Sequence, residues 1–285
     1  MSGFFVTKKI YKHLIVLIFM FKILFSAKKA ERHPFEMFFV GFFYSSLSLL
    51  LSSWIFPGYT SLTMVFFTVI SSIYVFQVAI RMEEKKEKDE VSEKWLLRHH
   101  IKPLLFLLFL FIGFVFSFAF WSFFLPLEKV AVIFNLQDSV VKDINSITGN
   151  ATVGGSFSTI FMNNINVLLI SLVLAFFYGA GAIFVLAWNA SVMGFVIGTF
   201  ARNSLGLVSL PVAFTKYFIH GIPEMLAYLI IALVGGILYI AFLKGDLLRE
   251  GKSKRIIIDS IILAAIAVIL LVIAALIEIY ISPSL

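Results

Sequence analysis

Residues 167–198 read VLLISLVLAFFYGAGAIFVLAWNASVMGFVIG and contain no Asp, Glu, Lys or Arg. A helix crosses the hydrocarbon core of a bilayer with about 20 apolar residues. This run is therefore long for a single crossing, and only Gly179 and Gly181 offer a place to turn. Either one span is followed by a re-entrant loop, or two short spans meet at a tight turn.

The basic residues favour the second arrangement. Apolar runs predict seven spans, at residues 35–56, 60–80, 103–125, 164–179, 180–200, 220–243 and 257–281. Nineteen of the 23 Lys and Arg residues then fall on one side of the membrane, in segments 1–34, 81–102 and 244–255. Because Lys and Arg accumulate in cytoplasmic loops, we expect a turn at residues 178–182, the N-terminus inside and the C-terminus outside. A re-entrant loop would place segment 244–255 outside.

The composition agrees with an all-α, polytopic transmembrane helical bundle in the cell membrane. The chain is 61% hydrophobic, with a mean hydropathy of +1.02. It contains no cysteine, which excludes disulfides, thiolate chemistry and cysteine-based metal sites. The sequence predicts no cofactor, no metal and no nucleic-acid partner. Its expected surroundings are the lipid bilayer and other membrane or envelope proteins, with a homo-oligomer as a further possibility.

Four regions follow from these runs. Segment 1–34 is predicted to be cytoplasmic and basic, with an amphipathic helix at 8–27 on the membrane surface; a short first crossing is the alternative. Residues 35–125 form three spans, and the charged cytoplasmic loop 81–102 prolongs the second as a solvated helix. Residues 126–163 form an extracytoplasmic loop. Residues 164–285 form a membrane core of four spans.

The stretch FIHGIPEML, residues 218–226, places polar and helix-breaking residues beside an apolar run. Gly221 is predicted to break a short helix that starts at Pro211, and Pro223 to begin the sixth span. Glu224 would then lie in the first turn, where free backbone N–H groups favour a carboxylate. His220 lies four residues away and is predicted to pair with it, either as a structural device or as a site for an ion, a proton or a headgroup.

Two further polar residues lie in predicted spans, where such groups suggest function. Asn189 accompanies the small residues Ala190, Gly194 and Gly198, which predict close helix packing with Asn189 hydrogen-bonded across the contact. A role for Asn189 in substrate binding is the alternative. Glu278 is either a solvated interface residue or a second carboxylate of the polar corner.

The order of these features resembles the stage II sporulation protein M family. The resemblance rests on the Asn163–Asn164 pair, Gly179–Ala180–Gly181, Trp188–Asn189, Gly194, Gly198, the segment from His220 to Glu224, Gly235–Gly236 and AALIEIYISP at 274–283. It covers mainly the last 120 residues. It implies an integral membrane protein whose sporulation namesake is the multi-spanning member of a complex with two peptidoglycan-degrading proteins.

Two functions stay open. A non-enzymatic scaffold or subunit of an envelope or membrane-remodelling complex needs no aqueous path. A small-solute or ion transporter using His220 and Glu224 should bring polar groups from several spans to the midplane, and only Asn189 is clearly there. An intramembrane hydrolase lacks a convincing nucleophile or metal set, so we expect no enzyme and assign no catalytic residue.

Single cysteines in this cysteine-free chain test the topology. A membrane-impermeant thiol reagent applied from outside should label Ser61→Cys and Ser156→Cys. Ser92→Cys and Ser253→Cys should react only after the membrane is permeabilised. External labelling of Ser253→Cys would contradict separate fourth and fifth spans.

Overall fold

The computed structural model describes residues 34–86, 96–148, 153–178, 181–204, 206–248 and 252–281. Over these ranges the chain forms nine α-helices and two short 3-10 turns, and no strand. The predicted N-terminal amphipathic helix at 8–27 and Gly179 lie outside the described residues. The all-helical fold class is confirmed.

Seven helices are long and apolar enough to cross a membrane, as predicted. They are α3 (Glu36–Ile55), α4 (Thr60–Lys86), α5 (Leu96–Phe124), α8 (Val153–Tyr178), α9 (Ala182–Asn203), α10 (Leu210–Leu243) and α11 (Lys252–Tyr280). The other two helices are α6 (Leu127–Ile133) and α7 (Asn135–Thr148), and the 3-10 turns are η2 (Gly206–Ser209) and η3 (Asp246–Leu248).

The apolar stretch 167–198 forms parts of two helices rather than one. Helix α8 ends at Tyr178 and α9 begins at Ala182. A Cβ atom on Gly181 would lie 2.6 Å from the carbonyl oxygen of Leu174, so the turn brings the chain back against its own preceding helix. A side chain at residue 181 would push the two helices apart.

The predicted break before the sixth span is wrong. Helix α10 is continuous from Leu210 to Leu243, with Gly221 and Pro223 inside it. The chain turns earlier, between α9 and α10, where Gly206 has a φ of +66° and Pro211 occupies the first helical turn. Proline is tolerated inside membrane helices because neighbouring helices and local adjustments compensate for the lost hydrogen bond.

The segment 126–163, predicted to be an extracytoplasmic loop, lies mostly between two candidate spans and is largely helical. It forms α6, α7 and the first turns of α8. Phe134, between α6 and α7, is fully buried. Its ring stacks on Phe195 of α9 at 5.5 Å and meets Phe118 of α5 edge-on at 6.4 Å. This aromatic contact ties the α6–α7 pair to the bundle.

The charged segment 81–102 is helical at both ends. Helix α4 continues to Lys86 and α5 already begins at Leu96, with Pro103 inside it. The third span therefore starts on a helix longer than the apolar run at 103–125.

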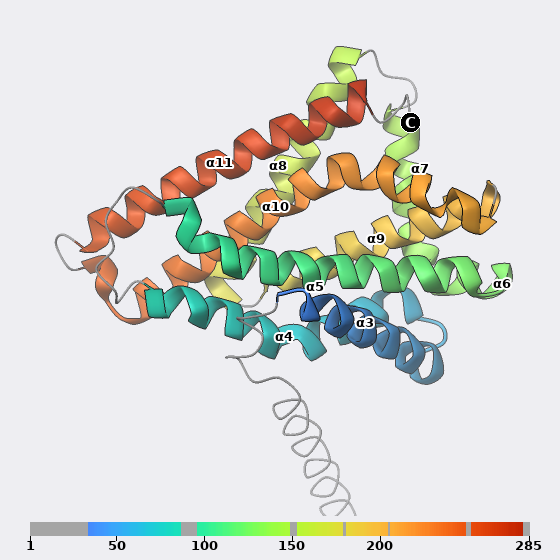
Figure 1. Cartoon of the computed structure of the whole chain (residues 1–285), viewed down its shortest axis with the longest axis horizontal. Coiled ribbons are helices and arrows are strands. Elements are labelled where there is room, and N and C mark those ends of the chain that lie inside the picture. Colours follow the sequence, from blue (N-terminus) through green and yellow to red (C-terminus); the bar gives the residue numbers. More distant parts are fainter. Residues whose placement is uncertain are drawn as a thin grey trace, which may run out of the picture.

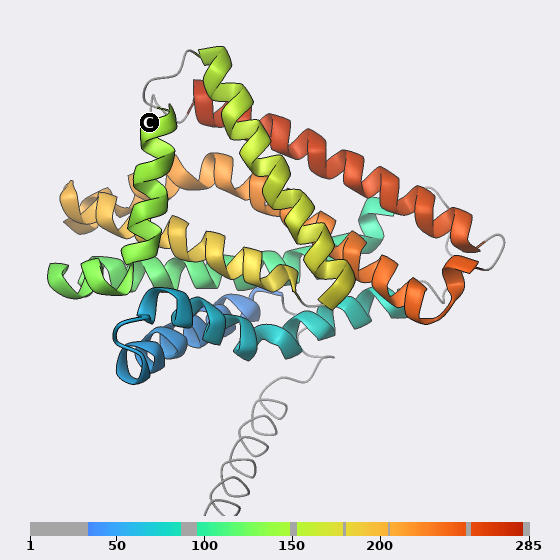
Figure 2. The same ribbon diagram turned by 180° about the vertical axis from the view of Figure 1, so that it is seen from behind.

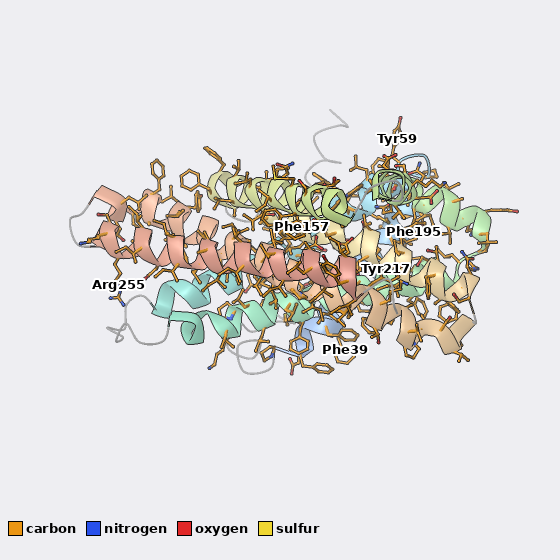
Figure 3. All side chains as sticks on the ribbon, turned by 90° about the horizontal axis from the view of Figure 1, so that it is seen from above. Phe39, Tyr59, Phe157, Phe195, Tyr217 and Arg255 are labelled. Carbon is orange, nitrogen blue, oxygen red and sulfur yellow. The ribbon has the colours of Figure 1, made fainter. Side chains whose placement is uncertain are left out.

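Helix α5 occupies the middle of the bundle. It packs against α3, α9, α4 and α10. Figures 1 and 2 show α3 and α4 along one side of α5, and α8 and α11 on the opposite side of the molecule. In the view from above, Phe195 lies among the helices, whereas Phe39 and Tyr59 extend from the edges (Figure 3).

Glycines allow the backbones beside α5 to approach closely. A Cβ on Gly41 of α3 would lie 3.2 Å from the Cα of Gly113 of α5. On the α9 side, a Cβ on Gly194 would lie 2.6 Å from the Cβ of Phe118, and one on Gly198 would collide with the Ser122 hydroxyl of α5. Contacts this short exclude any larger side chain at these positions.

The structure shows that Ser61 is a poor position for the external thiol-labelling experiment. Ser61 is buried and hydrogen-bonded, so a thiol there is a poor target for a water-soluble reagent. Gly58, in the same α3–α4 connection, is exposed with no atom within 4 Å of a Cβ. Gly58→Cys is the better external probe.

Replacing Gly198 with leucine should lower the melting temperature in detergent. The added side chain has no space between α9 and α5, and overpacking typically costs about 1–3 kcal/mol. Gly58→Ala serves as the control, because its new methyl group meets open space. Equal melting temperatures for Gly198→Leu and the unmodified protein would contradict the close α5–α9 contact.

Candidate functional site

The main polar contact in the second half of the chain lies on α10. The hydroxyl of Tyr228 donates a hydrogen bond of 2.9 Å to Oε1 of Glu224, one helical turn earlier. Tyr228 is only 1% exposed and Glu224 is half-buried. A polar pair in apolar surroundings is stable when its members satisfy each other.

Helix α11 contributes a second carboxyl group to the region around Glu224 and Tyr228. Glu278 is close enough to interact electrostatically with both Glu224 and Tyr228. Helices α10 and α11 pack extensively against each other and lie side by side in Figures 1 and 2. Glu224, Tyr228 and Glu278 are called the acidic cluster below.

His220 lies one turn before Glu224 on the same helix. Its ring hydrogen-bonds to the backbone of Lys216 and meets the ring of Tyr217 at a centroid distance of 6.4 Å. Figure 3 marks Tyr217 on α10. The predicted pairing of His220 with Glu224 stays a prediction.

The predicted position of Glu224 in the first turn of a helix is wrong. Because α10 begins at Leu210, Glu224 lies well inside the helix and not in its first turn. Free N–H groups of a helix N-terminus therefore do not solvate it. The hydroxyl of Tyr228 is the donor that it uses instead.

Asn189 bonds within its own helix and not to the acidic cluster. Its side-chain amide donates a 2.8 Å hydrogen bond to the Val185 carbonyl of its own helix, α9, rather than across the helix contact as predicted. Gly221 is buried against α9, where a Cβ would collide with the end of the Met193 side chain. Pro223 lies inside α10.

A second polar group, which the sequence did not suggest, joins α4, α7 and α9. Gln137 is completely buried. Its Oε1 accepts a 2.6 Å hydrogen bond from Ser61, and its Nε2 donates to the Ser191 hydroxyl at 3.0 Å. Ser191 in turn donates to the Trp188 carbonyl. Gln137 is followed by Asp138 and lies in a helix that also carries Lys142, so its burial could not be predicted from the sequence.

The acidic cluster offers carboxylate oxygens and one phenol. Within the described ranges no group of three or more His, Cys, Asp or Glu residues could hold a metal ion. The cluster brings together two spans only, α10 and α11. Its clearest chemical role on these contacts is to satisfy polar groups in an apolar region.

A double-mutant cycle tests the central contact of the cluster. Glu224→Ala and Tyr228→Phe should each lower the unfolding free energy, because each leaves a polar group without its partner. The double variant should lose less than the sum, with a coupling of about 1 kcal/mol.

Glu224→Gln is the control for this cycle, because its amide oxygen can still accept from Tyr228. Additive losses would show that the two side chains act independently. A parallel cycle with His220→Ala and Glu224→Ala tests the predicted His220–Glu224 pairing.

Comparisons with known proteins agree with the family resemblance of the sequence. The family model of stage II sporulation protein M matches residues 14–283, so the similarity extends far beyond the last 120 residues. The chain is 31% identical over 190 residues to an uncharacterized protein, MJ0793, of Methanocaldococcus jannaschii, which covers 64% of this chain and 94% of that protein. No solved structure matches the chain. The protein thus belongs to the stage II sporulation protein M family.

Proposed function

We propose that the protein is a non-enzymatic scaffold or subunit of an envelope or membrane-remodelling complex in the cell membrane. The observation that carries this proposal is the closely packed, apolar interior of the bundle. In an 18-residue window of the candidate spans in α5 and in α10, 61% is buried inside the structure, and the interior is filled with apolar side chains and glycine contacts.

The buried hydroxyl groups support the same function. Ser48, Thr68 and Ser171 each donate to a carbonyl oxygen four residues earlier in their own helix. A hydroxyl that bonds within its own helix needs no water molecule to satisfy its donor. A carrier, by contrast, is expected to gather polar groups from several spans near the membrane midplane.

Family membership adds a second line of support. The resemblance implies that the sporulation namesake is a multi-spanning member of a complex with peptidoglycan-degrading proteins. A membrane subunit of this kind needs a rigid bundle and a surface for partners. In an 18-residue window of the α8 and α11 spans, only 22% and 33% is buried, so much of their surface is available to lipid or another protein.

Photo-cross-linking in native membranes tests the scaffold function. A photo-reactive amino acid is placed at exposed positions on three helices, Ile70 of α4, Leu169 of α8 and Ile269 of α11. At least one position should give a discrete product with another membrane or envelope protein. The yield of that product should fall when the photo-reactive residue is moved around the same helix, away from that position.

Uptake measurements on the purified protein in liposomes test the alternative function, a transporter. Solute or ion uptake that is lost in Glu224→Gln would contradict the scaffold function and support a transporter. The absence of any cross-linked partner at all three positions would also count against the scaffold.

A further inference from the structure

Helix α8 carries a row of exposed residues with regular spacing. Successive members are four and three residues apart, which is the spacing of a helix that packs along another helix. All six are exposed, namely Thr159, Asn163, Asn166, Ile170, Val173 and Phe177. This row is called the α8 seam.

The seam contains two side chains that lipid cannot solvate. Asn163 and Asn166 lie inside the candidate span Phe157–Phe177, with Asn166 near its middle. Asn164, between them, faces inward and is 5% exposed. In hydrocarbon, a primary amide that faces lipid loses the hydrogen bonds that water would give it.

The contacts within the chain leave these amides largely unsatisfied. Asn163 makes one long hydrogen bond, 3.4 Å from its Nδ2 to Oδ1 of Asn164. Within the part of the chain that the structure describes, Asn166 makes no hydrogen bond. The rest of the seam is apolar, with Ile170, Val173 and Phe177 between 51% and 66% exposed.

We infer that the α8 seam pairs with the α8 seam of a second copy of this chain, with Asn163 and Asn166 hydrogen-bonded across the contact. An amide carries both donors and an acceptor, so it is complementary to itself. Asparagines on helix faces associate membrane helices by such bonds, and a polar residue in a heptad row fixes the register of a pair.

The geometry of the membrane agrees with a symmetric pair. Two copies with the same topology are related by a two-fold axis along the membrane normal, so their α8 helices run parallel and equal residues meet at equal depth. Asn166 of one copy therefore faces Asn166 of the other. For the same reason, Ile170 lies opposite Ile170 of the second copy, and Val173 lies opposite Val173.

This inference goes beyond the proposed scaffold function and does not depend on it. Disulfide cross-linking of the cysteine-free protein tests it directly. In pure protein in liposomes, Ile170→Cys and Val173→Cys should form covalent dimers on mild oxidation, with several-fold higher yield than Ile269→Cys. Ile269 is the matched control, because its 59% exposure is similar to the 53% of Ile170 and 51% of Val173, but it lies on α11.

A second measurement tests the amides. Energy transfer between donor- and acceptor-labelled copies, followed against the protein-to-lipid ratio, gives the dimer dissociation constant. Asn163→Leu and Asn166→Leu should each weaken the dimer about fivefold, while Asn166→Gln should weaken it less. Because the leucines face lipid, the melting temperature of the monomer should not fall.

Three results would overturn the inference. One is equal cross-linking at Ile269→Cys and Val173→Cys. Another is monomeric protein at every protein-to-lipid ratio. The third is cross-linking at seam positions only in native membranes and only to a different protein, which would assign the seam to another partner.

Discussion

Helices α3 and α9 both approach α5 so closely that ordinary side chains are excluded from the contacts. Lipid chains are as apolar as the helix surfaces, so burial in itself does not drive membrane helices together. Close packing and interhelical hydrogen bonds must do so. The glycines at residues 41 and 113 serve the α3 contact, and those at 194 and 198 serve the α9 contact. The positions of α4, α7 and α10 around this centre follow from these two contacts.

The same close approach decides where polar groups can bond. Because α5 and α9 nearly touch, the Ser122 hydroxyl reaches the Gly194 carbonyl at 3.2 Å. Arg202 of α9 donates to the Leu125 carbonyl at 2.7 Å, at the end of α5 where helix carbonyls lack partners within the helix. Gln137 reaches two neighbouring helices in the same way. These hydrogen bonds add to the packing because the backbones already lie within range.

Features that depend on local sequence could be predicted, and features that depend on distant contacts could not. The lengths of the apolar runs, together with the distribution of Lys and Arg, sufficed for the seven spans and for the turn after Tyr178. Gly221 and Pro223 suggested a break because they end helices in water, but in lipid the freed backbone groups have no solvent to bond. The helices at 126–163 were missed because Phe134 is buried by α5 and α9. Tyr228 was visible four residues after Glu224, but its electrostatic interaction with Glu278 depends on the packing of α11 against α10.

Polar residues of similar chemistry occupy three different environments in this bundle. Asn189 and many serines bond to their own helix, so they cost little and do not specify a neighbour. Glu224 and Tyr228 bond to each other within α10. Gln137 bonds to side chains of two other helices, and such a group fixes the relative positions of helices only when all members are present. Asn163 and Asn166 face outward at membrane depth, where only another polar surface can satisfy them. The role of a polar residue in an apolar helix therefore depends on what contacts its side of the helix. For these two asparagines, no residue that the structure describes covers their face, and this absence is the reason for the inferred pairing with a second copy.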